Sequence, residues 1–438
     1  MKRRNFLIAT AGTAVLTGIG CHSNLSDQEN ISSGLLDKNK KIAGFSLSEL
    51  YEKLSSHFYD GFLPFFLKNM VNYKDGGFYP YTEWDGKPRS GIESQESWWL
   101  VRGIWTVSFL YNHLLKEQKF IDIGERAVKI IIKNKPKGDS LWHKSFTPEG
   151  NPAENPSDHI YDDLFIAEGL AEFGIASGDK QYIELAKQTI LKCLRIYDSP
   201  EYKYSPTYDL NIEPLKAPGI LGHWMIFLVV TTQMLSYNED PEIKAINDRA
   251  LDAIMNYHFN TEFDLLNEIL CHDLSLPDND FAQFVYTGHA METLWMVMWE
   301  ANRRQDKELF NAAAQRFRRH LEISWDDVYG GVFRSLNHVG KNIWELDKQM
   351  WPQVEILVGT LLAYEYGGFD WAREWYGKMY LYFVKNFSLN KHNSPMWLLG
   401  GSRRPWDEPR QGTGAIYHLP RWMMMNLLSV KRMMEIHS

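Results

Sequence analysis

Residues 288–299, which read Gly-His-Ala-Met-Glu-Thr-Leu-Trp-Met-Val-Met-Trp, decide the fold of this chain. In the helix that this stretch predicts, hydrophobic residues occupy nearly every face, as expected of a helix enclosed by other helices. A tight turn follows at Asn302-Arg303-Arg304, and residues 307–322 then carry charges on one face only. The stretch therefore predicts a buried helix that folds back against an amphipathic helix facing solvent.

This pairing of a buried with an amphipathic helix recurs along the chain. Apolar residues repeat at helical spacing in segments that alternate between short and long connections. We expect helices near residues 47–69, 91–114, 119–134, 161–177, 180–196, 219–237, 241–258, 283–302, 306–322, 350–366, 370–386 and 411–435. Tight turns such as Ser177-Gly178-Asp179 make each even-numbered helix antiparallel to the next one. Six helical hairpins follow from this alternation.

Two concentric rings accommodate these hairpins. The more apolar even-numbered helices form the inner ring, and the amphipathic odd-numbered helices form the outer ring. The predicted fold class is therefore all-α, an (α/α)6 toroid. An open superhelical solenoid would have the same hairpin period, and we expect the closed ring. The long loops then emerge together at one end of the toroid, where loops concentrate function.

Two of these long loops contain similar glycine pairs. Asp75-Gly76-Gly77-Phe78 is followed by Asp85-Gly86-Lys87, and residues 329–333 (Tyr-Gly-Gly-Val-Phe) are followed by Gly340-Lys341. Glycine pairs suit tight hairpin turns. We expect short β-hairpins at the loop end, which form the wall of a pocket.

The sequence favours one large domain at residues 46–438. No linker or low-complexity stretch divides this region, although a typical domain has only about 100–200 residues. The chain is 44% hydrophobic, and its 16 Trp and 22 Tyr residues exceed the usual needs of packing. With a formal net charge of -8 and scattered basic residues, the sequence predicts no nucleic-acid partner.

The first residues differ from the rest of the chain. Residues 2–7 read Lys-Arg-Arg-Asn-Phe-Leu, and an apolar run at residues 8–20 leads to Cys21. We interpret residues 1–21 as a twin-arginine-like export signal, with Cys21 as a candidate lipoprotein cysteine and residues 22–45 as a polar tether. Position 18, usually Leu in lipoprotein signals, is Gly. The protein is thus expected to be periplasmic or in the cell envelope, with a lipid anchor at Cys21 as its membrane contact.

Unusual polar and aromatic residues fall at the first turns of the predicted inner helices, just after the long loops. They are Tyr161, His223, His289, Trp351 and His418, while Arg102 lies deeper in its helix. In a toroid the starts of the inner helices surround one mouth of the central cavity. Imidazole, with a pKa near 6.5, exchanges protons at neutral pH, and two imidazoles on opposite faces of one carbon can invert it.

Two further groups suit the same chemistry. Glu292 follows His289 by three residues and shares its helix face. It is a candidate to orient the imidazole, to handle a hydroxyl proton, or to pair with an arginine such as Arg102. Arg102 is also a candidate to stabilise a developing enediolate oxygen.

Other chemistries find less support in the sequence. A glycosidase needs two carboxyl groups, and the candidates are the adjacent pairs Asp162-Asp163 and Asp326-Asp327, whose side chains point in different directions. No histidine pair at ligand spacing lies where the mouth is expected, and no phosphate-binding glycine-rich loop occurs. We therefore predict neither a metal nor a cofactor.

Four motifs stand out along the chain: Gly288-His289-Ala290-Met291-Glu292, Lys348 with Met350-Trp351-Pro352-Gln353-Val354-Glu355, Tyr417-His418-Leu419-Pro420-Arg421, and Arg102-Gly103-Ile104-Trp105-Thr106-Val107-Ser108. Together they resemble the N-acylglucosamine 2-epimerase family, which includes cellobiose 2-epimerases and aldose-ketose isomerases. The resemblance runs in order from about residue 47 to 436. Its implied fold is the (α/α)6 toroid.

The resemblance also implies roles for individual residues. His289 and His418 match the general acid/base pair, Arg102 matches the arginine that supports the enediolate, and Glu292 matches the acid beside the first histidine. His223 resembles a third histidine proposed to assist ring opening. Tyr161 and Trp351 match pocket residues, and Trp105 and Lys348, within the matching motifs, are candidates for substrate binding.

Departures from the family pattern affect substrate recognition. Near His223 the cellobiose epimerase and isomerase branches have Asn and Glu, where this chain has Gly219 and Ile226. Before His418 many members carry an aromatic residue and a lysine, where this chain has Thr413 and Gly414. The substrate therefore cannot be taken from the resemblance.

The sequence predicts a sugar 2-epimerase that acts on a reducing mono- or disaccharide through a cis-enediolate, as a monomer or homodimer. The nearest alternative is an aldose-ketose isomerase of the same family. A sugar-binding surface lipoprotein without catalysis is an alternative of another class, and a glycoside hydrolase on the same toroid is a third.

Overall fold

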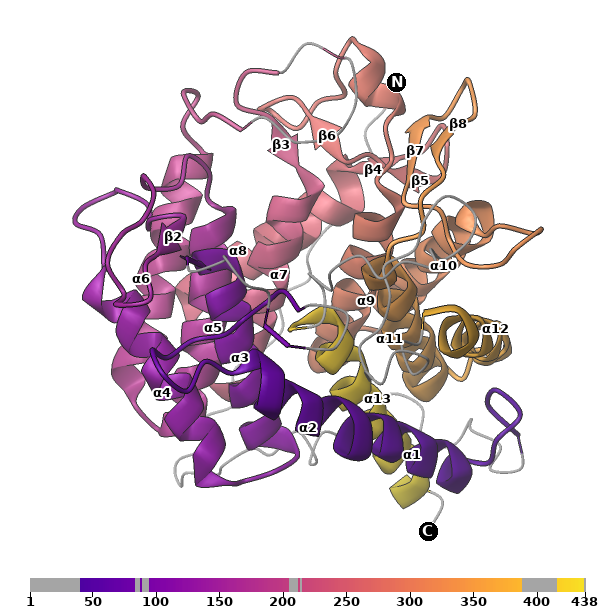
Figure 1. The fold of residues 1–438 in the computed structure, drawn as a ribbon. Helices are drawn as coiled ribbons and strands as arrows, with labels where there is room; N and C mark the ends of the chain where they lie inside the picture. The colour runs from indigo at the N-terminus through magenta and orange to yellow at the C-terminus, as the bar shows by residue number, and fades with distance from the viewer. Residues whose placement is uncertain are drawn as a thin grey trace, which may run out of the picture.

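The computed structural model describes residues 40–82, 87–88, 94–204, 212, 215–387 and 416–436. The predicted export signal, Cys21 and the tether up to residue 39 lie outside these ranges, as do Thr413 and Gly414. Figure 1 shows the helices following one another around a ring, from indigo at the N-terminal side to yellow at the C-terminal side.

Six helices of the described chain form the inner ring. They are α3 (Ser97–His113), α5 (Tyr161–Ser177), α7 (Leu221–Tyr237), α9 (Thr287–Arg304), α11 (Met350–Gly367) and α13 (His418–Ile436). Each of these helices packs against the next, and α13 contacts α3. The ring is therefore closed, which confirms the toroid and excludes the open solenoid.

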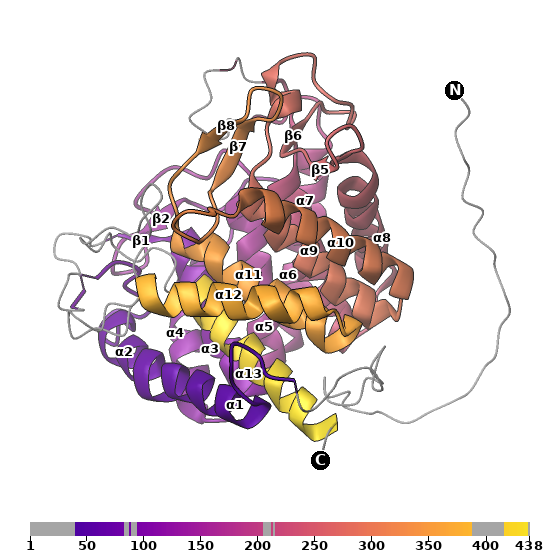
Figure 2. The ribbon, with the colours of Figure 1, turned by 90° about the vertical axis from the view of Figure 1, so that its right-hand side faces the viewer.

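The outer ring pairs one helix with each inner helix. Its members are α1 (Leu47–Ser55), which continues through π-helical turns at Ser56–Phe62 and Phe66–Met70 on either side of α2 (Leu63–Phe65), then α4 (Gln118–Lys133), α6 (Lys180–Tyr197), α8 (Pro241–Asp252), α10 (Lys307–Ser324) and α12 (Asp370–Phe387). The first helix of the chain lies beside the last, α1 against α13, in both Figure 1 and Figure 2. The two ends of the chain therefore supply the sixth pair of inner and outer helices.

Local sequence signals set the tight connections within each hairpin. Gly178 adopts a left-handed conformation after α5, and Asp179 caps the first turn of α6 by accepting a hydrogen bond from the Gln181 amide. Asp306 caps α10 in the same way. The turn predicted at Asn302-Arg303-Arg304 lies slightly later, because α9 continues to Arg304 and Gln305 is the left-handed residue.

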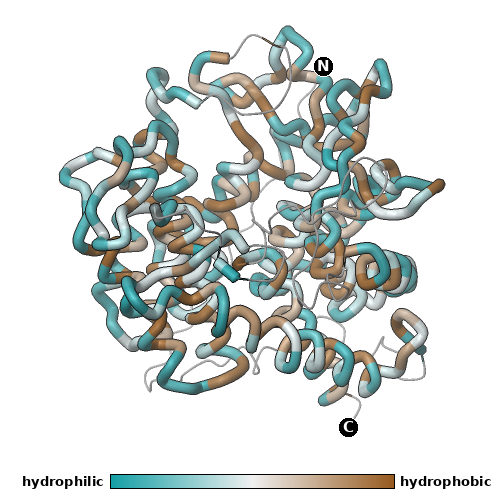
Figure 3. The backbone as a smooth tube through the Cα atoms, viewed as in Figure 1, coloured by the Kyte–Doolittle hydropathy of each residue, from teal (hydrophilic) through white to brown (hydrophobic). Residues whose placement is uncertain are grey.

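The inner and outer helices differ in how many of their residues are buried. Almost every residue of α7 and α11 is buried, whereas the outer helices bury one face. Figure 3 shows hydrophobic and hydrophilic residues alternating along the outer helices. Four inner helices begin later than predicted: α3 at Ser97, α7 at Leu221, α9 at Thr287 after a short 3-10 turn at Asp280–Gln283, and α13 at His418.

Short antiparallel strands occupy the loop end. The pairs are β1 (Gln95–Glu96) with β2 (Ser145–Phe146), β3 (Gly219–Ile220) with β6 (Ile269–Leu270), β4 (Phe259–Asn260) with β5 (Leu265–Leu266), and β7 (Ser335–His338) with β8 (Ile343–Glu345). The hairpin expected around Gly340 is β7–β8. Around Gly76 and Gly77, both at positive φ, the structure instead has a turn closed by a single Val71–Phe78 bridge.

The folded domain begins earlier than position 46. Ile42 is buried and bridges to Phe45, and Arg373 of α12 donates to the Lys41 carbonyl at 3.0 Å. The last six residues of the predicted tether therefore pack against the toroid. Within the described residues, no helix has both the length and the apolar character that a membrane crossing requires.

Candidate active site

A cavity of 620 Å³ opens where the first turns of the inner helices meet. Six of the predicted site residues line it, namely Arg102, Tyr161, His289, Glu292, Trp351 and His418. They come from five different inner helices, because α9 supplies both His289 and Glu292. A volume of this size is typical of a small-molecule site.

His289 lies in the first turn of α9, and its Nδ1 lies 3.0 Å from Oε1 of Glu268. Glu268 is fully buried in the connection between β5 and β6. Because a carboxylate only accepts hydrogen bonds, Nδ1 donates, and Nε2 is left to exchange a proton with a ligand. Burial lowers the pKa of His289, but the Glu268 carboxylate outweighs it, and the pKa is raised above its ordinary value.

His418 has the opposite electrostatic balance. Its Nδ1 lies 2.8 Å from Oε1 of Glu355 and 3.8 Å from Oε1 of Glu292. Burial holds the pKa of His418 well below its ordinary value; the nearby Glu292 carboxylate opposes this, while Arg421 reinforces it. The two histidines of one cavity are thus biased toward different protonation states.

Arg421 lies among the acids beside His418 and adds to the effect of burial on the pKa of that histidine. Its Nη2 forms ion pairs with Glu292 and with Glu355, the latter at 2.7 Å, and its Nη1 donates to the Tyr417 hydroxyl at 2.9 Å. Glu292, Glu355 and His418 lie close enough together to share one cation, and the guanidinium of Arg421 is the cation placed among them.

These contacts correct two expectations for Glu292. Its arginine partner is Arg421, from the family-like motif at residues 417–421, and not Arg102. The carboxylate that holds Nδ1 of His289 is that of Glu268, whereas Glu292 pairs with Arg421.

Trp351 separates the two histidines along the cavity wall. The centroid of its ring lies 5.6 Å from that of His289 and 5.5 Å from that of His418. Its indole nitrogen donates to Oε1 of Gln349 at 2.8 Å. At Gly288 an added Cβ would lie 2.5 Å from the indole, so the absence of a side chain there lets Trp351 approach α9.

Arg102 is held by aromatic rings. Its guanidinium carbon lies 4.1 Å from the ring centroid of Trp98, 4.2 Å from Phe165 and 4.7 Å from Tyr417. Burial lowers the pKa of Arg102 to about 10, and its Nε has no hydrogen-bond partner within the described residues. The guanidinium therefore keeps donor capacity for an oxygen of a bound ligand.

Tyr161 brings a hydroxyl close to His289. A Cβ built on Gly222 would lie 1.7 Å from the Tyr161 hydroxyl and 3.1 Å from Cε1 of His289, so both side chains converge on this glycine. The hydroxyl is buried without a hydrogen-bond partner in the described chain. It is a donor available to a ligand that enters the cavity.

The remaining cavity wall carries aromatic rings and acids that were not predicted. It includes Tyr81, Glu96, Trp98, Trp99, Glu154, Tyr204 and Tyr286. Aromatic faces and carboxylate acceptors suit the apolar faces and hydroxyl groups of a sugar. These residues come mostly from loops, where no periodic pattern marks them in the sequence.

Three predicted site residues do not line the cavity. His223 is fully buried behind Tyr161, with ring centroids 4.4 Å apart, and neither of its nitrogens has a hydrogen-bond partner among the described residues. Trp105 lies one helical turn below Arg102 and donates to Gln233 at 3.1 Å. Both residues are enclosed because inner helices are surrounded on all sides.

Lys348 is the third of these residues. Its side chain is fully buried, and its amine donates to Asp326 at 2.7 Å and to the Gly330 carbonyl at 2.6 Å. Lys348 thereby ties the glycine turn to the start of α11. It contacts the loop scaffold rather than the cavity.

The two pairs of adjacent acids considered for glycosidase chemistry do not point together into the cavity. Asp163 forms an ion pair with Lys192 at 2.6 Å and accepts from the Trp142 amide, so it is a structural group. Asp326 is held by Lys348. Of these four acids, Asp162 is the one that lines the cavity. Neither pair therefore places two carboxyl groups on opposite sides of a ligand in this cavity.

Glu268, Glu355 and Arg421 were not predicted as site residues. Glu355 and Arg421 stand within motifs quoted above. Each lies about one helical turn after a predicted site residue, Glu355 after Trp351 and Arg421 after His418, and this spacing could have marked both as site residues. Glu268 follows short strands and precedes His289 by 21 positions. No local pattern links these two residues.

Comparison with known proteins agrees with this architecture. A cellobiose 2-epimerase of Dictyoglomus turgidum is 22% identical over 367 residues, which cover 80% of this chain and 89% of the relative. The solved structure of cellobiose 2-epimerase from Spirochaeta thermophila superposes with a TM-score of 0.74 at 15% identity, covering 89% of this chain and 98% of its own. A D-mannose isomerase structure has a TM-score of 0.68 at 12% identity, with 88% and 97% covered.

The sequence also matches the model of a protein family, which shows more than the fold. The model is described as N-acylglucosamine 2-epimerase (GlcNAc 2-epimerase), and it matches residues 76–421, which contain all nine predicted site residues. Since this match spans most of the chain, the protein belongs to the N-acylglucosamine 2-epimerase family and is an enzyme of the isomerase class.

Proposed function

We propose that the protein is a sugar 2-epimerase that acts on a reducing mono- or disaccharide through a cis-enediolate. One observation carries this proposal: His289 and His418 line the same cavity, and each has its Nδ1 held by a buried carboxylate. Two imidazoles with their Nε2 atoms available can remove and return a proton at one carbon.

In the proposed mechanism the sugar ring opens, and one histidine removes the proton from carbon 2. The electron pair of that C–H bond forms the enediolate, whose negative oxygen is stabilised by the Arg102 guanidinium. The opposite histidine then donates a proton to the other face of carbon 2. The protein side chains supply every proton transfer in this scheme.

Exchange with solvent tests the proposal. Reducing mono- and disaccharides incubated with the enzyme in deuterated water are expected to gain deuterium at carbon 2, observed by NMR, together with the C2 epimer. His289→Ala and His418→Ala are each expected to slow formation of the C2 epimer by about 10² to 10⁴-fold while retaining the fold. Near-normal epimer formation in either folded variant would overturn the two-histidine mechanism.

An aldose-ketose isomerase is the second candidate. It uses the same enediolate and delivers the proton to carbon 1, and the similarity in fold to a D-mannose isomerase favours considering it. Deuterium at carbon 1 with formation of a ketose would identify this activity. Binding of a sugar without any exchange would instead support the non-catalytic sugar-binding protein.

We also propose that the protein is exported and anchored through Cys21. The support is the twin arginine at residues 3–4, the apolar run that follows and the cysteine after it. In this proposal the toroid folds before export, since twin-arginine signals carry folded proteins. The substrate would then be a sugar of the cell envelope or its surroundings.

A further inference from the structure

Charge around the two histidines is distributed unequally, and the difference is geometric. His418 faces Glu355 from α11, Glu292 and His289 from α9, Arg102 from α3, Arg421 from its own helix, and Tyr417 from the turn just before that helix. Arg421 bonds to both of the acids that approach His418. Its guanidinium lies within the ion-pair distance of each carboxylate and 3.3 Å from Nδ1 of His418.

The surroundings of His289 differ in one respect. His289 faces Glu268 from the β5–β6 connection, Glu292 from its own helix, Arg102 from α3, and the rings of Tyr286, Trp351 and His223. The acid that holds its Nδ1, Glu268, does not contact Arg421 in the described structure; Arg421 pairs with Glu292 and Glu355. Arg421 therefore offsets the acids beside His418 and lies next to that histidine, whereas it makes no such contact with the acid that holds His289.

We infer that Arg421 is a positioning residue that keeps His418 unprotonated in the resting enzyme, so that His418 is the proton acceptor and His289 the proton donor. A cation close to a titratable base disfavours its charged form, and a cation bonded to neighbouring carboxylates cancels their attraction for a proton. The opposite pKa directions of His289 and His418 agree with this geometry.

This assignment rests on the proposed epimerase function and gives the first turnover a direction. The C2–H bond breaks, its proton passes to Nε2 of His418, and its electron pair forms the enediolate. The proton on Nε2 of His289 then forms the new C–H bond on the opposite face. His418 ends as the imidazolium and His289 as the neutral imidazole, and exchange with water restores the resting state.

The test compares Arg421→Gln with Arg421→Lys, which retains the charge. In Arg421→Gln the two carboxylates attract a proton to His418, so its pKa rises. The acid limb of the kcat/KM–pH profile for C2 exchange is then expected to move upward by about one pH unit or more. Arg421→Lys is expected to keep the limb within a few tenths of a pH unit of the wild type. A limb that stays in place in folded Arg421→Gln would overturn the inference.

A second measurement does not depend on activity or on that variant folding. NMR of the full chain labelled with ¹⁵N-histidine, with His418→Asn used for assignment, reports the protonation of His418 during a pH titration. A neutral His418 and a protonated His289 near pH 6.5 are expected, and a charged His418 at that pH would overturn the inference. Repeating the titration on folded Arg421→Gln is expected to show a higher pKa for His418, and an unchanged pKa would overturn the role of Arg421. If the wild type shows no C2 exchange, the proposed function fails, while this comparison still decides the role of Arg421.

Discussion

Among single residues, Glu268 controls how tightly His289 holds its proton. Glu268→Gln keeps the size of the side chain and removes the charge that raises the pKa of His289. The pKa of His289 should therefore fall, and the proton donor is lost at lower pH. We expect the alkaline limb of the kcat/KM–pH profile for C2 exchange to move to lower pH.

The matched control for this prediction is Glu262→Gln, on the exposed turn between β4 and β5. It removes the same charge at a distance from the cavity lining. An equal movement of the alkaline limb in both variants would show that general charge, and not the contact with His289, sets the profile.

Gly222 is the residue at which Tyr161 and His289 converge. An alanine Cβ there would lie 1.7 Å from the Tyr161 hydroxyl, so Gly222→Ala forces Tyr161 to move. We expect C2 exchange to fall at least tenfold. Tyr161→Phe removes the clashing oxygen, and the added cost of Gly222→Ala in that background should be smaller, measured as kcat/KM of all four proteins. Equal costs in both backgrounds would contradict this placement of Tyr161.

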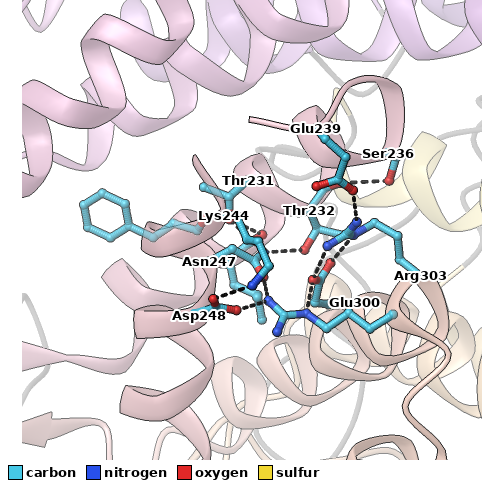
Figure 4. A network of polar contacts seen from close by, with 12 residues as sticks. Thr231, Thr232, Ser236, Glu239, Lys244, Asn247, Asp248, Glu300 and Arg303 are labelled. Atoms are coloured by element: carbon cyan, nitrogen blue, oxygen red, sulfur yellow. Dashed lines mark hydrogen bonds and ion pairs between the residues drawn. The ribbon is translucent and has the colours of Figure 1, made fainter. Parts of the chain in front are cut away.

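At the scale of helices and loops, a polar network joins α7, α8 and α9 at the end of the toroid opposite the cavity (Figure 4). Glu300 is fully buried and accepts from Arg303 at 2.8 Å and also from Arg304. Arg304 continues to Asp248, and Asn247 reaches Thr231 at 2.9 Å and Thr232 at 3.2 Å. The network connects the C-terminal end of α9 to the neighbouring hairpin of α7 and α8.

Glu300→Gln is expected to lower the free energy of unfolding by about 2 kcal/mol. This is less than the roughly 3–5 kcal/mol for one partner of a fully buried pair, because Arg303 and Arg304 keep Glu239 and Asp248 as partners. Urea denaturation followed by circular dichroism measures the change. Glu308→Gln, on the exposed side of α10, is the control and should be near neutral.

Lys348 tests whether a motif residue binds substrate or supports a loop. Lys348→Met fills similar volume and leaves the Asp326 carboxylate buried without this cation. We expect a lower melting temperature with an unchanged KM for the sugar, because Lys348 does not line the cavity. A large rise in KM without loss of stability would restore Lys348 as a substrate-binding residue.

At the scale of the whole molecule, the proposed lipid anchor predicts where the protein resides. Cys21→Ser removes the thiol that lipidation requires and leaves the toroid unchanged. The variant is expected to move from the membrane fraction to the soluble periplasmic fraction, followed by immunoblotting. Cys193→Ser, which alters a buried free thiol, should stay with the membrane fraction. Equal fractionation of Cys21→Ser and the wild type would contradict the anchor.

The sequence by itself determined the helical hairpins, the division into inner and outer helices, and the placing of His289, Trp351 and His418 at the starts of inner helices. These features are local: apolar spacing, caps such as Asp179 and left-handed glycines act within a few residues. The motif match at residues 288–292 and 417–421 added the prediction that His289 and His418 act as an acid/base pair.

Only the tertiary structure decided which charges meet. Glu268 reaches His289 from a loop, Arg421 joins acids from α9 and α11, and Lys348 turns away from the cavity. Arg421 and Lys348 lie within recognisable motifs, whereas no local pattern marks Glu268. Closing the ring sets the rotation of each helix, and that rotation selects the partner of every buried side chain. Periodicity marks the buried face of a helix but carries no information about which neighbour that face meets.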